Sequence, residues 1–160
     1  KDFDMLAMGR TQGKGCYCYV NSVLKAQVDK YVNNYRYMII DNEAGLEHIS
    51  RGTLPHVETM LLVSDCSRRG IQAVARIAEM VGELELKPNT MKLIVNRAPG
   101  GVLNDAVREE IDKHGLILAG VLPQDETVNE YDCEGKPSSK IPETSPVKVA
   151  LHQLMEDLDL

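Results

Sequence analysis

Two cysteines separated by a single residue are the first candidates for chemistry in this sequence. Cys16 and Cys18 form a C-x-C pair flanked by glycines. In an extended segment both thiolates lie on one side of the chain, whereas a helix would turn them apart. Two sulfurs do not complete the four-ligand site that Zn²⁺ usually takes, and thiolates also bind Ni²⁺. The pair therefore predicts either half of a metal site, completed by a second pair across a twofold dimer, or two ordinary thiols.

A carboxylate and an amide, each placed after an apolar run, are the next candidates. Asp41 precedes a small-residue turn at Ala44-Gly45. An Asp at a strand tip can hold Mg²⁺ through water, and the glycine lets the backbone approach a phosphate. Asn96 ends another apolar run, and its amide can both donate to and accept from adenine. The competing interpretations are a helix cap for Asp41 and a strand-terminal turn for Asn96.

Short apolar runs alternate along the chain with segments of helical period. The apolar runs do not alternate strictly between apolar and polar residues, which is typical of strands covered on both faces. The predicted strands are Phe3–Met8, Tyr37–Asp41, Thr59–Ser64, Met91–Asn96 and Ile117–Leu122. The predicted helices are Asn21–Asn34, Ser67–Gly82, Leu103–His114 and Pro146–Leu158. This pattern predicts an α/β fold with an open, mostly parallel sheet and helices on both faces.

The ends of the predicted strands are where function is expected. In open parallel sheets, ligands bind outside the carboxyl ends of the strands. The segments at those ends are Gly9–Gly13, Asp41–Gly45, Asp65–Ser67, Asn96–Pro99 and Pro123–Asp125. The sequence shows no internal repeat and no dividing linker, so we expect residues 1–160 to form a single domain.

Composition argues against several classes of partner. The formal net charge is −6 and the basic residues are scattered, so nucleic-acid binding is not expected. No apolar stretch approaches the roughly 20 residues of a membrane span. No signal peptide is visible, so we expect a cytoplasmic protein. Four cysteines in that setting indicate thiols or metal ligands more than a disulfide framework.

Three motifs, in order and each at a strand end, carry a family resemblance. Asp41–Gly45 resembles the Walker B segment of MinD-type ATPases, which usually reads D-x-P-A-G. Leu93–Arg97 resembles the strand end whose Asn reads adenine, and Val121–Val128 with Gly135–Pro137 is similar to the adenine-side loop and its turn. The glycine-flanked C-x-C segment resembles that of the nickel-insertion ATPases that serve carbon monoxide dehydrogenase. These ATPases belong to the superfamily of MinD and the nitrogenase iron protein.

This resemblance implies a P-loop NTPase-like fold and ATP or ADP with Mg²⁺ as the cofactor. It implies a catalytic role for Asp41 and a Ni²⁺ or Zn²⁺ site at Cys16 and Cys18, at a homodimer interface. The residues implied on the adenine side are Asn96, Arg97, Pro123, Gln124 and Asp125. Carbon monoxide dehydrogenase is the implied client.

The P-loop of the resembled family is not found in this sequence. The nearest string, Gly9–Gly15, has three residues between its glycines and a Gly in the Ser/Thr position of G-x-x-x-x-G-K-[ST]. Because a strand is expected from Phe3, we expect this chain to be the C-terminal portion of such an ATPase, without the first strand and the P-loop. We therefore expect that it does not hydrolyse ATP by itself. The alternative function is a MinD/ParA-like positioning ATPase, against which the acidic last segment and the C-x-C pair both count.

Overall fold

The computed structural model describes residues 3–7, 18–42, 57–83 and 88–158. The chain divides into two compact units, residues 1–57 and 58–160, and each is described by itself. The first contains helix α1 (Cys18–Tyr31). The second contains β1 (Thr59–Asp65), α3 (Arg68–Glu83), β2 (Thr90–Ala98), η1 (Pro99–Gly101), α4 (Asp105–Lys113), β3 (Leu118–Pro123), α5 (Glu126–Glu134), η2 (Ser138–Lys140) and α6 (Pro146–Asp157). The single domain remains a prediction.

The second unit is built on a parallel sheet of three strands in the order β1-β2-β3. Thr59 to Asp65 pair residue by residue with Thr90 to Asn96. β3 pairs with the other side of β2 and places Pro123 opposite Ala98. A helix lies in each connection, because neighbouring parallel strands need a long return path. The predicted α/β fold is confirmed in this unit.

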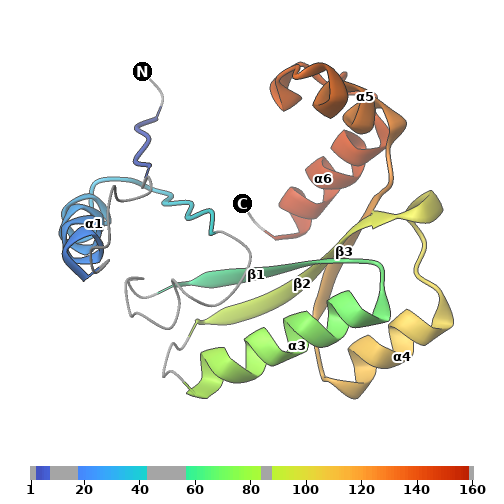
Figure 1. Cartoon of the computed structure of the whole chain (residues 1–160), viewed down its shortest axis with the longest axis horizontal. Coiled ribbons are helices and arrows are strands. Elements are labelled where there is room, and N and C mark those ends of the chain that lie inside the picture. Colours follow the sequence, from blue (N-terminus) through green and yellow to red (C-terminus); the bar gives the residue numbers. More distant parts are fainter. Residues whose placement is uncertain (1–2, 8–17, 43–56, 84–87, 159–160) are drawn as a thin grey trace. The chain divides into compact units, whose positions relative to one another are not determined.

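Helices α3 and α4 cover one face of the sheet (Figure 1). Along β1, buried and more exposed residues alternate, and Met60 and Leu62 are buried. The residues that α3 buries follow the three- and four-residue spacing of an amphipathic helix. They are Ile71, Val74, Ala75 and Val81. The apolar stripe visible in the sequence is therefore the face that makes this half of the core.

Helix α6 lies on the opposite face and packs on β3 (Figure 1). Its Leu154 is buried. A Cβ atom at Gly120 of β3 would lie 2.9 Å from Leu154 Cδ1, so the missing side chain makes room for the leucine. The helices therefore lie on both faces of the sheet, as the alternating pattern predicted.

Helix α5 (Glu126–Glu134) begins inside the segment Val121–Val128, which the resemblance interpreted as a loop, and that interpretation is wrong for Glu126–Val128. The side chain of Asp125 accepts the N–H of Thr127 at 2.9 Å and caps the first turn. Gly135 ends the helix with a φ of 66°, a left-handed conformation that glycine adopts without steric cost. Both caps are readable in the sequence, and together they fix the helix between them.

The first unit corrects two predicted strands. The described residues 3–7 and 37–42 are in neither a helix nor a strand. Met5 is 83% exposed and Ile39 is 89% exposed, so neither run is buried in this unit. An apolar run becomes a strand only when its backbone groups pair with a neighbour, and neither run has such a ladder here. The hydroxyl of Tyr35 donates instead to the carboxylate of Asp4.

The helix predicted at Asn21–Asn34 is confirmed, but it begins earlier, at Cys18. Cys18 is therefore the first residue of a helix. Cys16 lies outside the described residues. In the described ranges, none of the helices combines the length and the apolar character needed to cross a bilayer.

Candidate functional site

The carboxyl ends of the three strands form one edge of the sheet. Asp65, the last residue of β1, is in register with Asn96 of β2. Ala98, the last residue of β2, is in register with Pro123, the last residue of β3. Because all three strands are parallel, the residues that follow them share this edge. All five residues that the resemblance implies on the adenine side lie here: Asn96, Arg97, Pro123, Gln124 and Asp125.

Asn96 and Arg97 form a local turn within the end of β2. Arg97 has a φ of 57°, a left-handed conformation that is uncommon outside glycine. The side-chain oxygen of Asn96 accepts the backbone N–H of Arg97 at 2.8 Å and so holds this conformation. The thiol of Cys66 donates to the Arg97 carbonyl oxygen at 3.6 Å from the end of β1. The Arg97 side chain is left exposed, and its backbone is fixed from two sides.

The end of β3 is tied to the same turn. The backbone N–H of Gln124 donates to the carbonyl oxygen of Ala98 at 2.9 Å. A Cβ atom at Gly101 would lie 3.6 Å from Pro123, so the η1 turn comes close to the end of β3. Pro123 and Gln124 are thereby held beside the Asn96–Ala98 segment. The side chain of Gln124 remains exposed.

Asp125 uses its carboxylate within the protein. Besides capping α5, it accepts the hydroxyl of Ser145 and the N–H of Val147, the latter at 3.2 Å. The hydroxyl of Ser145, followed by the backbone N–H groups, holds the pKa of Asp125 below its ordinary value. Sequence reasoning missed Ser145, although a Ser directly before Pro146 is a recognisable helix-start signal.

Asp65 and Ser67 cap α3 at the end of β1. The hydroxyl and the N–H of Ser67 both donate to Asp65, at 2.7 and 3.0 Å, and lower the pKa of this carboxyl. The Ser67 hydroxyl oxygen in turn accepts the N–H of Gly70 at 3.0 Å. Ser67 therefore caps the first turn of α3. The Oδ1 atom of Asp65 is thus used in hydrogen bonds to the start of α3.

The remaining predicted site residues belong to the first unit or lie outside the described residues. Asp41 belongs to the first unit, where it is exposed and follows a segment without regular structure. Cys18 is the first residue of α1, and Cys16 and the residues 43–45 of the Walker B-like motif lie outside the described residues. Within the described ranges, no group of three or more His, Cys, Asp or Glu side chains could hold a metal ion. The proposed C-x-C site is not tested by this, because Cys16 is not among them.

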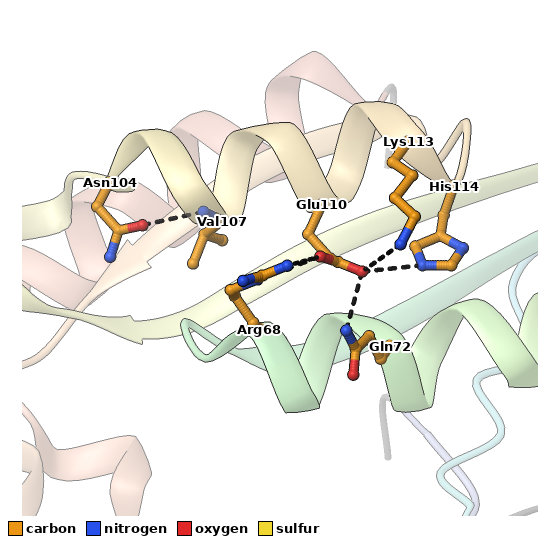
Figure 2. Close-up of polar contacts among 7 residues, drawn as sticks. All are labelled: Arg68, Gln72, Asn104, Val107, Glu110, Lys113 and His114. Carbon is orange, nitrogen blue, oxygen red and sulfur yellow. Dashed lines mark hydrogen bonds and ion pairs between the residues drawn. The ribbon is translucent and has the colours of Figure 1, made fainter.

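A second polar cluster joins α3 to α4 and has a structural character (Figure 2). The carboxylate of Glu110 lies 2.7 Å from Arg68 and 3.0 Å from the amide of Gln72, both on α3. Lys113 and His114 complete its partners at 3.4 and 3.2 Å. The Arg68 hydrogen bond, then that of Gln72, lowers the pKa of Glu110 to about 2. In sequence this Glu is recognisable only by its position on the apolar stripe of α4.

Comparison with solved structures identifies the fold. MinD of Aquifex aeolicus matches with a TM-score of 0.68 and 20% identity, over 87% of this chain and 60% of that one. A ParA family ATPase from Chlorobium tepidum matches with a TM-score of 0.69 and 21% identity, over 86% and 56%. The fold is that of the MinD and ParA ATPases. The carboxyl edge described above is thus the edge of a MinD/ParA-type sheet.

Curated relatives extend this finding to sequence. An uncharacterized ATP-binding protein of Methanocaldococcus jannaschii is 36% identical over 162 residues, which cover 99% of this chain and 62% of the relative. The carbon monoxide dehydrogenase accessory protein CooC of Rhodospirillum rubrum is 27% identical over 134 residues, or 82% of this chain and 49% of CooC. The chain thus spans between about half and 62% of the length of these relatives. No protein-family model matches it.

Proposed function

We propose that the complete protein is an ATP-binding ATPase of the MinD/ParA type, and that the carboxyl edge of its sheet holds the adenine base. The observation that carries this proposal is the hydrogen bond from Gln124 N–H to Ala98 O, which joins two strand ends whose residues suit a base. An ATP-binding relative at 36% identity supports the same ligand. MinD of Pyrococcus horikoshii, with the same fold, has been solved in complex with Mg-ADP.

The chemistry of the edge fits adenine. An amide side chain both donates and accepts, which suits the mixed edge of the base. The oxygen of Asn96 already accepts the Arg97 N–H, while its amide nitrogen has no hydrogen-bond partner among the described residues and is available to donate. Arg97 and Gln124 are exposed and add a planar guanidinium and a second amide. A planar guanidinium can also stack on an aromatic face.

Asp41 is the residue that we assign to Mg²⁺. Its carboxylate is exposed in the first unit, and Mg²⁺ prefers carboxylate oxygens together with water and phosphate. A bound Mg²⁺ would supply charge neutralisation on the phosphates, with Asp41 orienting the ion. Replacement of Asp41 by Asn should therefore reduce the dependence of ATP affinity on Mg²⁺.

The finer part of the proposal is metal transfer. Similarity to CooC at 27% identity and the glycine-flanked Cys16-x-Cys18 pair support a cytoplasmic metallochaperone ATPase. In it, two such pairs would form a four-thiolate site for Ni²⁺ or Zn²⁺ across a homodimer. Carbon monoxide dehydrogenase would be the client that receives nickel. The alternative, a MinD/ParA-like positioning ATPase, would have no use for this thiolate pair.

The nucleotide proposal is tested by the affinity of the complete protein for ATP, measured by calorimetry. We expect Asn96→Ala to weaken ATP binding by about tenfold, as loss of a specific hydrogen bond does. Asn89→Ala is the matched control, because Asn89 lies just before the opposite end of the same strand. Equal effects of the two substitutions would show that Asn96 does not contribute to the base site. Absence of ATP binding by the wild type would disprove the proposal itself.

The metal proposal is tested by titration with Ni²⁺ and Zn²⁺, followed by light scattering. We expect about one ion per two chains and a dimer for the wild type. The double variant Cys16→Ser/Cys18→Ser should lose both, whereas Cys133→Ser, which changes an exposed thiol on α5, should lose neither. Equal binding by all of the proteins would leave the ATPase proposal standing without metal transfer.

A further inference from the structure

The carboxylate of Asp125 links the first turns of two helices. Its Oδ1 accepts the N–H of Thr127 in α5 at 2.9 Å, and its Oδ2 accepts the N–H of Val147 in α6 at 3.2 Å. The hydroxyl of Ser145 donates to the same Oδ2. Both oxygens are therefore engaged by the protein. One side chain between β3 and α5 thus fastens the start of α6, some twenty residues further along the chain.

Ser145 takes an unusual part in this arrangement. It occupies the N-cap position of α6, yet its side chain does not cap its own helix. Its hydroxyl donates to Asp125, which then accepts the Val147 N–H that an N-cap serine would ordinarily accept. Ser145 is 5% exposed, so a hydroxyl placed there without a partner would be costly. Ser145 and Asp125 therefore depend on each other.

The hydrogen bonds of Asp125 to Thr127, Ser145 and Val147 form what we call the carboxylate clamp. The clamp is adjacent to the proposed base-binding edge. Gln124 immediately precedes Asp125, and its N–H is bonded to Ala98 O on the neighbouring strand. Gln124 thus lies between two restraints, the strand end on one side and the carboxylate clamp on the other. A carboxylate can only accept hydrogen bonds, and both Asp125 oxygens already accept them. The geometry therefore favours an indirect role for Asp125 over contact with a base.

We propose that Asp125 is a positioning residue, which together with Ser145 uses the start of α6 to hold Gln124 at the correct place for an adenine base. This inference rests on the proposed function, since it concerns the same base site. It predicts that a substitution at Ser145, a buried residue on a different element, alters base selectivity at the strand ends.

The test uses the complete protein and compares its affinity for ATP and for GTP. We expect Asp125→Asn and Ser145→Ala each to weaken ATP binding by about tenfold and to reduce the preference for ATP over GTP. Ser145→Thr, which keeps the hydroxyl, should retain both. The matched controls are Asp132→Asn on α5 and Ser139→Ala in η2, which change exposed side chains of the same types.

Hydrogen exchange of the Gln124 amide supplies a second readout that does not depend on the nucleotide. Its protection should fall in Ser145→Ala and in Asp125→Asn, and stay unchanged in the two controls. If Asp125→Asn weakens ATP binding while Ser145→Ala keeps wild-type affinity and protection, Asp125 acts by direct contact and the positioning role is wrong. Wild-type behaviour of both variants would also overturn it. A wild type that binds no ATP but shows the predicted exchange changes would disprove only the nucleotide function.

Discussion

The guanidinium of Arg68 lies 2.7 Å from the carboxylate of Glu110, whose side chain is only 2% exposed (Figure 2). The two residues are far apart in sequence, and each belongs to a helix that covers the same face of the sheet. The remaining partners of Glu110 are the neutral amide of Gln72, Lys113 at the end of α4, and His114 at the C-cap of that helix. The contact is therefore a cross-link between α3 and α4 in which a covered anion depends on its partners.

Glu110→Gln should lower the thermal stability of the protein by roughly 5 °C, a moderate shift for a chain of this size. The substitution keeps the shape of the side chain but removes the charge that Arg68 and Lys113 face. The measurement is the melting temperature at pH 7. Glu109→Gln, which changes an exposed neighbour on the same helix, should shift it by less than half as much. Equal shifts would show that the cross-link contributes nothing specific.

The same carboxylate predicts a pH dependence. In the folded protein the pKa of Glu110 is lowered to about 2 from an ordinary 4.5. A lowered pKa means that this stabilisation is present above about pH 4.5 and is lost as the pH falls toward 2. The difference in melting temperature between wild type and Glu110→Gln should therefore shrink between pH 5 and pH 3 (approximate bounds). A difference that stays constant over that range would contradict the assignment.

Substitution of two glycines of α3 by alanine should change the free energy of unfolding in opposite directions. At Gly70 a Cβ atom would lie 2.3 Å from Asp65 Oδ1 and 2.6 Å from Ser64 Oγ, so Gly70→Ala must displace the cap of the helix. We expect Gly70→Ala to lower the free energy of unfolding by about 2 kcal/mol. Gly82 has nothing within 4 Å of that position, and Gly82→Ala should gain about 0.5–1 kcal/mol from helix propensity. Urea unfolding of both variants measures this, and a shared sign would disprove the steric account.

Arg97→Gly should separate stability from binding. Glycine adopts the φ of 57° without the steric cost that arginine has there. The relief of this cost outweighs the larger conformational entropy of glycine in the unfolded chain, and the free energy of unfolding should rise by about 0.5 kcal/mol. The variant should therefore be slightly more stable than the wild type. It should bind ATP more weakly, because the exposed guanidinium is gone. Unfolding in urea and calorimetry with ATP check the two effects, and unchanged affinity would assign Arg97 to the turn alone.

Local pattern predicted most of the second unit. The strands at Thr59, Thr90 and Leu118 and the helices α3, α4 and α6 follow from apolar period and caps, which are short-range properties. Strand formation at Phe3–Met8 and Tyr37–Asp41 was predicted from apolarity, but pairing with a neighbour decides it, and sequence does not specify that neighbour. Helix α5 is not among the predicted helices, although Asp125 and Gly135 are residue types that commonly begin and end a helix.

The candidate site also contains residues whose positions follow from sequence and residues whose roles depend on tertiary contacts. Asn96, Arg97 and the Pro123–Asp125 segment were predicted at one edge because parallel strands end together. The role of Asp125 inside the protein could not be predicted, since it depends on Ser145, which only the folding of α6 onto β3 brings close. Glu110 was likewise hidden, because a single charge on an apolar stripe does not reveal which partners will surround it.

The missing side chain at Gly120 also has a consequence for the history of this sequence. Because Leu154 fills that space, the spacing between α6 and β3 is set by the sum of two side chains and not by either alone. A lineage that acquired alanine at position 120 would be expected to exchange Leu154 for a smaller residue such as valine. Positions 120 and 154, distant in sequence, should therefore vary together among the descendants of a common ancestor.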